Sequence, residues 1–498
     1  MLITESIQTW MPLWACLSAL LAVIPILVFR KETFLREGVT FLAGVLMLGF
    51  VISMIPDVLS GKVLECTLLQ ITAEVPIKFR VDGLGLLFGL VASSLWIVTS
   101  LYSVGYMRAL KEHSQTRFFV FFAISLCATM GVAIAGNLLT LYLFYEMLSL
   151  ATWPLVTHHQ DKEARGGGRK YLTYLLGTSV GFALPALIFC YVKASATGLE
   201  FSAAGFLAGN IAGGTEALIL ILLFTFGFSK AGLMPFHSWL PGAMVAPTPV
   251  SALLHAVAVV KVGVFCIIRV FTGVFGLEFL KTLDVAIVVA WIAAFTIITS
   301  SLIALTQDNL KRRLAFSTIG QLAYIILGVA LLNDHAVQGS MLHIAMHAAG
   351  KITLFMCAGA IFVATGKKYV SEMVGIGRRM PITMAAFFIG ALSVIGLPPT
   401  GGFVSKWHLV LGTADAGQIA LLGVLIVSSL LNIAYLLPPV WKAFYVPDGV
   451  KAEFDEGGRQ EAPWACVVPL CVTAAACVAL FLKPDLLINL TVLMTGVN

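Results

Sequence analysis

The sequence predicts an all-α protein that crosses a membrane about fourteen times. Its 498 residues are 59% hydrophobic and only 11% charged, whereas soluble proteins carry about 25% charged residues. The apolar residues form runs of the length, about 17–25 residues, that crosses the hydrocarbon core as a helix. The sequence lacks the alternating segments of a membrane β-barrel. We therefore expect a single membrane domain over residues 1–498.

Fourteen apolar runs follow one another along the chain. They are centred near residues 20, 47, 94, 127, 147, 182, 228, 260, 294, 324, 352, 396, 432 and 473. The first run has no basic residue before it and no small-residue cleavage site after it, so we interpret it as a retained span and not a signal peptide. The longest loops are expected at about 56–80 and at 446–462, and neither reads as a soluble domain.

The distribution of Lys and Arg predicts the orientation of the spans. With fourteen spans, 20 of the 31 basic residues lie in loops on one side of the membrane and 7 on the other. Basic loops remain in the cytoplasm, so we expect both termini outside.

Composition also restricts the possible ligands. The nine cysteines show no C-x-x-C pair and no metal-type spacing, so we expect neither a disulfide framework nor an iron–sulfur site. The basic residues are spread over many loops, and this distribution does not favour the binding of nucleic acid. The run Gly166-Gly167-Gly168 lacks the strand that precedes a phosphate-binding loop. We expect no cofactor, no bound metal and no catalytic chemistry.

Two spans are interrupted by glycine and proline, and both carry a lysine. The seventh reads GFSKAGLMPFHSWLP (227–241) and the twelfth reads IGLPPTGGFVSKWH (395–408). Five spans separate them, and a shift by an odd number of spans inverts the topology, as in an inverted repeat. Paired broken helices indicate a transport site. A further break precedes the eighth span, and the residues at the three breaks are Pro235, Pro247, Pro249, Pro398, Pro399, Gly401 and Gly402.

Five charged residues lie inside apolar runs, where each costs roughly 2.5–3.5 kcal/mol on insertion scales. They are Glu146, Lys230, Lys261, Lys351 and Lys406. Ionisable groups at membrane depth are functional by default. Helix packing is the alternative for Glu146, and snorkelling to an interface is the alternative for Lys230.

Three titratable groups share one face of the eleventh span. His343, His347 and Lys351 are spaced i, i+4, i+8. Two histidines at i, i+4 are also a metal pair, but the sequence offers no third ligand nearby. His255, six residues before Lys261, points to a different neighbour. Burial favours a neutral lysine and a nearby carboxylate favours a charged one, so these groups are suited to passing protons.

These segments resemble the antiporter-like subunits of respiratory complex I, membrane-bound hydrogenases and Mrp-type sodium/proton antiporters. The resemblance covers nearly the whole chain, most clearly 117–445. Segments 364–387 and 462–470 look like the D-type subgroup of Mrp antiporter subunits. The lysine at position 406 departs from the complex I subunits that carry glutamate there, and we do not expect the long lateral helix that another complex I subunit carries after its last span.

The resemblance implies fourteen helices with two inverted five-helix repeats. It implies three first helices in 1–116, repeats in 117–272 and 273–445, and a connector and last helix in 446–498. Glu146 would pair with Lys230. Lys261, with the face of His343, His347 and Lys351, would form the central connection, and Lys406 would be the terminal lysine. From its position near Lys261, we add His255 to this expected proton path.

The resemblance also implies a function and partners. We expect a proton-translocating subunit of a multisubunit Na⁺/H⁺ antiporter in a bacterial or archaeal cytoplasmic membrane, with other membrane subunits as partners. A subunit of a redox-driven proton pump, a stand-alone solute transporter and a structural membrane scaffold are the alternatives.

Overall fold

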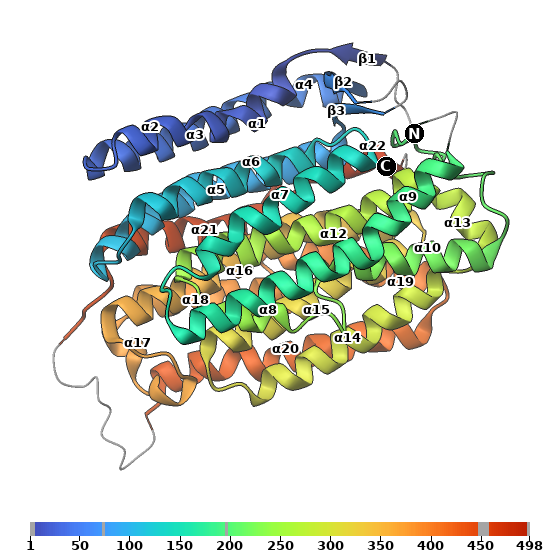
Figure 1. Cartoon of the computed structure of the whole chain (residues 1–498). Coiled ribbons are helices and arrows are strands. Elements are labelled where there is room, and N and C mark those ends of the chain that lie inside the picture. The colour runs from blue at the N-terminus through green and yellow to red at the C-terminus, as the bar shows by residue number, and fades with distance from the viewer. Residues whose placement is uncertain (1–4, 72–74, 195–197, 447–457, 496–498) are drawn as a thin grey trace.

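The computed structural model describes residues 5–71, 75–194, 198–446 and 458–495. Most of them lie in long helices that run side by side, with a small sheet at one end of the bundle (Figure 1). The expected helical membrane fold is therefore confirmed. The end of the bundle that carries the sheet is called the sheet end below, and the opposite end, where most basic loops lie, is called the basic end.

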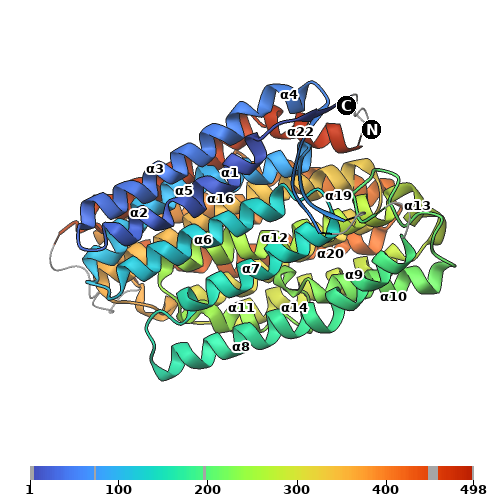
Figure 2. The same ribbon diagram turned by 45° about the horizontal axis from the view of Figure 1, so that its top comes forward.

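The chain begins with a helical hairpin packed on the outside of the bundle. It comprises α1 (Met11–Leu21), α2 (Val23–Val28), α3 (Thr33–Ser53) and α4 (Ile55–Leu59). Contacts with helices α5 (Gly83–Ala109) and α6 (Gln115–Ala133) fix it there, as Figure 2 shows. Its outer face exposes large apolar side chains, which suits contact with lipid.

Residues 56–80, expected to be a loop, contain two strands. The sheet order is β1 (Glu5–Gln8), β2 (Lys62–Gln70), β3 (Pro76–Val81). β1 pairs with β2 in parallel, and β2 pairs with β3 in antiparallel register. The loop prediction was wrong here because hydropathy does not detect short, half-exposed strands.

Polar caps set where the next helices begin. The side chains of Asp82, Asn137 and Asp161 accept hydrogen bonds from backbone N–H groups in the first turns of α5, α7 (Leu138–Val156) and α8 (Lys162–Thr178), groups that otherwise have no partner within the helix. α8 continues through a π-helical turn, η1 (Ser179–Ala183), into α9 (Leu184–Lys193).

The seventh span is broken, as predicted. α10 (Gly214–Gly227) ends before a short 3₁₀ turn, η2 (Ser229–Ala231), and the chain resumes helical structure in α11 (Trp239–Gly242) and η3 (Ala243–Val245). The eighth span combines π-helical η4 (Val250–Ala258), α12 (Val259–Arg269) and π-helical η5 (Val270–Phe275).

The second half of the chain consists of further long helices and contains the second broken span. Its elements are α13 (Leu277–Leu283), α14 (Ala286–Thr306), α15 (Leu310–Ala330), α16 (Asp334–Thr365), η6 (Val370–Glu372), α17 (Ile376–Arg379), α18 (Pro381–Ile395), α19 (Gly401–Asp415), α20 (Ile419–Phe444), α21 (Trp464–Leu482) and α22 (Asp485–Thr495). The twelfth span is broken between α18 and α19.

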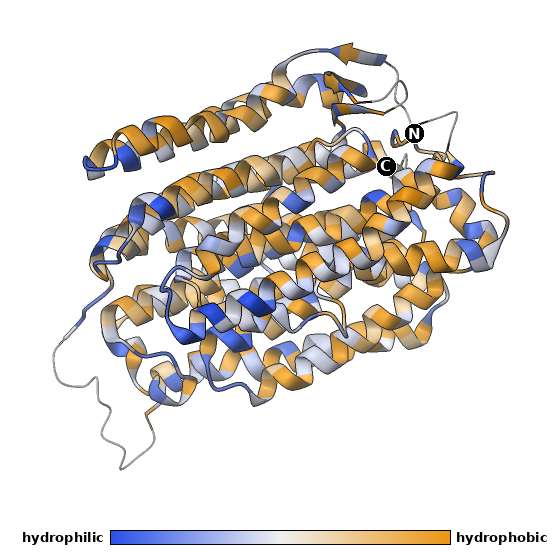
Figure 3. Cartoon of the chain, viewed as in Figure 1, coloured by the Kyte–Doolittle hydropathy of each residue, from blue (hydrophilic) through white to orange (hydrophobic). Residues whose placement is uncertain are grey.

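In the described part of the chain, twelve helices are long and apolar enough to cross a membrane, not counting the two broken spans. The count of fourteen stays a prediction that these broken spans would complete. The most buried helices are α15 and the eighth span, whose most apolar windows are entirely covered by the rest of the protein. Figure 3 shows apolar residues along the bundle and polar residues gathered toward its ends. The polar side chains of α12, α15 and α16 are therefore held away from lipid.

Candidate functional site: buried lysines and histidines

Lys230 lies in the break of the seventh span and is fully buried. Its ammonium group donates hydrogen bonds to the Tyr145 carbonyl at 2.8 Å and to the Ser149 hydroxyl at 2.6 Å. It also lies 3.0 Å from the centre of the Tyr145 ring. A buried ammonium is stable only when its donors find such partners.

Glu146 directly follows Tyr145 in α7, but its carboxylate does not contact the Lys230 ammonium group. Both carboxylate oxygens of Glu146 are buried without a hydrogen-bond partner, and no ion pair joins them to Lys230 among the described residues. In this structure the Glu146 carboxylate and the Lys230 ammonium group are thus not paired. Their pairing stays a prediction.

Lys261 and His347 are in direct contact at the centre of the bundle. The Lys261 ammonium nitrogen meets Nδ1 of His347, and both residues are buried. The contact joins α12, from the first half of the chain, to α16, from the second half. The other ring nitrogen of His347, Nε2, has no hydrogen-bond partner in the described part of the chain.

His343 lies one turn before His347 on α16 and contacts it. Its ring stacks on the His347 ring at 5.5 Å between centres. Nδ1 lies 2.8 Å from the Ser405 hydroxyl, and Nε2 lies 3.0 Å from Oε1 of Gln321. Nδ1 of His343 therefore faces a hydroxyl group that can both donate and accept a proton, whereas Nε2 faces an amide oxygen that only accepts a hydrogen bond.

Lys406 lies beside the second helix break, which interrupts the twelfth span. Its ammonium group donates to the Ile395 carbonyl at 2.9 Å and lies 4.6 Å from the centre of the Tyr324 ring. The Tyr324 ring is in turn 5.9 Å from the His343 ring. We call Lys261, His347, His343, Tyr324 and Lys406 the lysine–histidine row.

Lys351 and His255 lie outside this row. The Lys351 ammonium donates to the Leu314 carbonyl at 3.2 Å. His255 packs beside the Tyr171 and Trp239 rings, and neither of its ring nitrogens has a hydrogen-bond partner among the residues that the structure describes. The sequence placed all eight groups in one path, but the structure brings only part of them into contact.

The helix breaks supply backbone groups to the lysines. Ile395, whose carbonyl binds Lys406, is the last residue of α18. Pro398 and Pro399 lie in the gap, whereas Gly401 and Gly402 begin α19. At Gly402 a Cβ atom would lie 1.7 Å from the Ser393 carbonyl oxygen, so only glycine permits this approach of the two half-helices.

The other break residues surround Lys230 and the start of the eighth span. Pro235 follows η2, and Pro247 and Pro249 immediately precede η4. In this break the indole N–H of Trp239 donates to the Ser229 carbonyl at 3.0 Å, which satisfies a backbone group freed by the interruption.

Sequence reasoning missed the polar partners of these groups. They are Tyr145, Ser149, Gln321, Tyr324 and Ser405. Gln321 and Ser405 are polar residues inside apolar helices, which is the signal that could have identified them.

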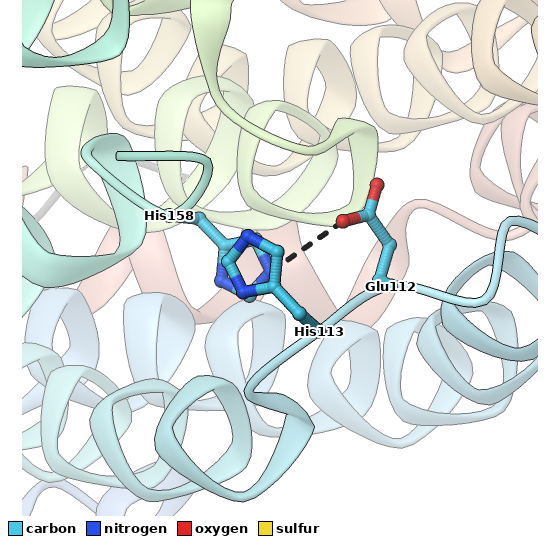
Figure 4. Close-up of side chains that lie close together, drawn as sticks. All are labelled: Glu112, His113 and His158. Atoms are coloured by element: carbon cyan, nitrogen blue, oxygen red, sulfur yellow. Dashed lines mark ion pairs between the residues drawn. The ribbon is translucent and has the colours of Figure 1, made fainter. Parts of the chain in front are cut away.

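Sequence reasoning also missed a cluster in two loops at the basic end. Glu112 and His113 precede α6, and His158 follows α7 (Figure 4). His159 is the next residue of the second loop. We call these four residues the histidine cluster. Burial raises the pKa of Glu112, but the neighbouring imidazoles lower it by more, so this pKa lies below its usual value. Burial lowers the pKa of His159.

Known proteins share both the sequence and the architecture. Residues 135–432 match the transmembrane family model described as NADH:quinone oxidoreductase/Mrp antiporter. The chain is 34% identical over 404 residues to NADH-quinone oxidoreductase subunit N of Desulforudis audaxviator, covering 78% of each protein. It is 34% identical over 423 residues to the A subunit of the Na(+)/H(+) antiporter of Alkalihalophilus pseudofirmus, covering 79% of this chain but only 50% of that protein.

Two solved structures share the fold. A chain of the Mrp complex from Dietzia sp. superposes with a TM-score of 0.86 at 22% identity, covering 98% of this chain and 96% of that chain. A chain of the membrane-bound sulfane sulfur reductase, an archaeal respiratory membrane complex, superposes with a TM-score of 0.83 at 21% identity, covering 98% and 97%. With the sequence match over more than half its length, the chain belongs to the NADH:quinone oxidoreductase/Mrp antiporter transmembrane family.

Proposed function

We propose that this protein is a proton-translocating subunit of a multisubunit monovalent cation/proton antiporter. The observation that carries the proposal is the lysine–histidine row, a set of buried groups in contact from Lys261 to Lys406. Such groups are costly inside a membrane and serve there as proton relays. Sodium/proton antiporter subunits among the relatives support this choice.

The proposed path has two parts. Glu146 and Lys230 form the first part, in which approach of the carboxylate favours the charged lysine and its departure favours release of a proton. The lysine–histidine row forms the second part, in which His347 and His343 accept and donate protons between Lys261 and Lys406.

We propose that Lys351 and His255 connect the row to the basic end. α16 runs from the sheet end to the basic end, so Lys351 lies beyond His347 in that direction. His255 lies on η4, which starts at the basic end. The Lys311 ammonium, on α15, donates to the Ala246 carbonyl at 2.7 Å, close to the start of η4.

The proposal includes the setting of the protein. We place it in a bacterial or archaeal cytoplasmic membrane, with the basic end in the cytoplasm and both termini outside. Other membrane subunits are the proposed partners, since the structural relatives are parts of complexes. Segments 364–387 and 462–470 support the position of the D-type subunit in an Mrp complex.

The test uses the assembled complex in proteoliposomes with a fluorescent pH probe. Lys230→Ala and Glu146→Ala are expected to abolish cation-dependent proton flux while assembly is unchanged. Lys281→Ala is the matched control, because Lys281 pairs with Glu278 on the surface. Full flux in both path variants would refute the proposal.

A subunit of a redox-driven proton pump is the second candidate. It is favoured by the relative named as an oxidoreductase subunit, which this chain matches over 78% of its length. Purification from the native membrane distinguishes the two. Copurifying chains with flavin or iron–sulfur centres would favour the redox complex, and copurifying antiporter subunits would favour the antiporter.

A further inference from the structure

The histidine cluster joins two loops that are far apart in sequence. Glu112 and His113 lie between α5 and α6, and His158 and His159 lie between α7 and α8. One ligand atom from each of Glu112, His113 and His158 lies within 4.8 Å of the others. Figure 4 shows the two imidazoles side by side with the carboxylate beside them.

His158 is the unusual member of the cluster. It is fully buried, yet neither ring nitrogen has a hydrogen-bond partner within the described ranges of the chain. Its Nε2 instead faces Glu112, 3.6 Å from Oε2. Buried polar groups without partners are rare and costly, and a ligand at this point would satisfy the free ring nitrogen.

The distances suit a small ion better than direct hydrogen bonds. Nδ1 of His159 is also 3.6 Å from Oε2 of Glu112. Ligand atoms around a tetrahedral zinc ion, at about 2.0–2.2 Å from the metal, lie about 3.3–3.6 Å from one another. The two 3.6 Å contacts therefore lie at the upper end of the separation between two ligands of one zinc ion.

His113 is the ligand that would have to move. Its ring is parallel to the His158 ring, with 4.8 Å between the centres, so the lone pairs of the two rings lie in parallel planes. His113 is exposed, and a turn of its side chain would direct one nitrogen toward Glu112 and His158 without disturbing the packed helices.

We propose that the histidine cluster is a binding site for a divalent transition metal of the zinc type, held by Glu112, His113 and His158 with His159 as the fourth ligand. Imidazole nitrogen with one carboxylate is a ligand set preferred by Zn²⁺, Ni²⁺ and Cu²⁺. Mg²⁺ and Ca²⁺ prefer all-oxygen sites. This site lies outside the proton path and is independent of the proposed function. It departs from the expectation of no metal.

Metal binding would have a mechanical consequence. The ion would join the loop before α6 to the loop after α7 and so fix the ends of both helices. α7 also carries Ser149 and Tyr145, which hold Lys230. The cluster begins about 18 Å along this helix from Glu146, at 1.5 Å per residue.

The test measures zinc binding by the chelator-treated full-length protein in nanodiscs. Titration against a fluorescent zinc chelator is expected to give one tight equivalent per chain, together with a rise in melting temperature. His113→Ala and Glu112→Gln are expected to weaken binding at least tenfold and to remove the thermal shift. Both residues are in loops and His113 is exposed, so these variants should fold.

Two further measurements make the result specific. His335→Ala is the matched control, because His335 pairs with Asp415 at the other end of the bundle, and it should bind zinc like the wild type. Co²⁺ in place of Zn²⁺ should give the intense visible absorption of tetrahedral cobalt in the wild type and in His335→Ala, but not in His113→Ala or Glu112→Gln. Absence of a tight equivalent in the folded wild type, or unchanged binding in His113→Ala and Glu112→Gln, would overturn the proposal.

Discussion

The Lys261 ammonium group and Nδ1 of His347 meet at the point where the two halves of the chain come together. Lys261 belongs to α12 and His347 to α16. The two residues are the one direct contact between titratable side chains that connects the two halves within the lysine–histidine row. In the proposed path, proton transfer between the two halves therefore depends on this pair.

His347→Gln should lower proton flux by roughly tenfold or more, because glutamine keeps a polar side chain but cannot carry a proton through the position. Flux would be measured in proteoliposomes containing the assembled complex. His335→Gln changes a histidine at the surface and should leave flux unchanged. Equal flux in the two variants would show that protons bypass His347.

We expect the aromatic ring of Tyr324, and not its hydroxyl group, to support proton flux. Tyr324→Phe keeps the ring beside Lys406 but loses the hydrogen bond from the hydroxyl to the Leu425 carbonyl, at a cost of about 1 kcal/mol of stability. Tyr324→Leu also removes a cation–π contact worth about 2 kcal/mol when desolvated.

We therefore expect near-normal flux with phenylalanine and reduced flux with leucine. Flux and thermal unfolding of both variants provide the check. Loss of flux in Tyr324→Phe would instead assign the proton transfer to the hydroxyl group.

Gly402→Ala should destabilise the break of the twelfth span. The new methyl group would overlap the Ser393 carbonyl oxygen, and overpacking of this kind costs about 1–3 kcal/mol. Gly423→Ala is the control, because no atom lies within 4 Å of a Cβ there and alanine favours a helix by about 1 kcal/mol. Melting temperatures in detergent should fall for the first variant and not for the second.

Asp82 and Arg269 form a buried ion pair at the sheet end, with contacts of 2.5 and 2.6 Å. Asp82→Asn should cost about 3–5 kcal/mol, because Arg269 would be left buried without a counter-charge. Asparagine can still cap α5. Asp57→Asn breaks a half-exposed pair with Lys62 and should cost less than about 1 kcal/mol.

The same pair predicts a pH dependence. Burial raises the pKa of Asp82, but Arg269, the Gly85 N–H group and Arg80 together lower it by more, so the folded-state pKa lies below the ordinary value. The carboxylate therefore contributes full stability above its unfolded pKa of about 3.9 and loses that contribution as the pH falls toward the folded pKa. The difference in melting temperature between wild type and Asp82→Asn should be constant near neutral pH and shrink below about pH 4. A constant difference down to acidic pH would contradict this account.

The spans and breaks could be predicted because their signals are local. Runs of apolar residues and the pairs Pro398-Pro399 and Gly401-Gly402 are read within one segment of sequence. The contacts of Gln321 and Ser405 with His343 depend on how three helices pack, and no periodicity in one helix contains that information.

The histidine cluster escaped prediction for the same reason. Glu112-His113 and His158-His159 are ordinary residues in their own loops, and only the antiparallel packing of α6 and α7 brings the loops together. The separation of Glu146 from Lys230 likewise depends on side-chain direction: adjacent residues of α7 face different neighbours, so Tyr145 meets the lysine and Glu146 does not.

The parallel pairing of β1 with β2 depends on correct insertion of the intervening hairpin into the membrane. Both strands lie at one end of the bundle, so the hairpin between them has to cross the membrane and return before Glu5 can meet Lys62. If one crossing failed, the strands would lie on opposite sides of the membrane and the edge of β2 would stay open, a surface prone to pairing with other chains. The sheet therefore closes only on a chain whose first two spans have been inserted correctly.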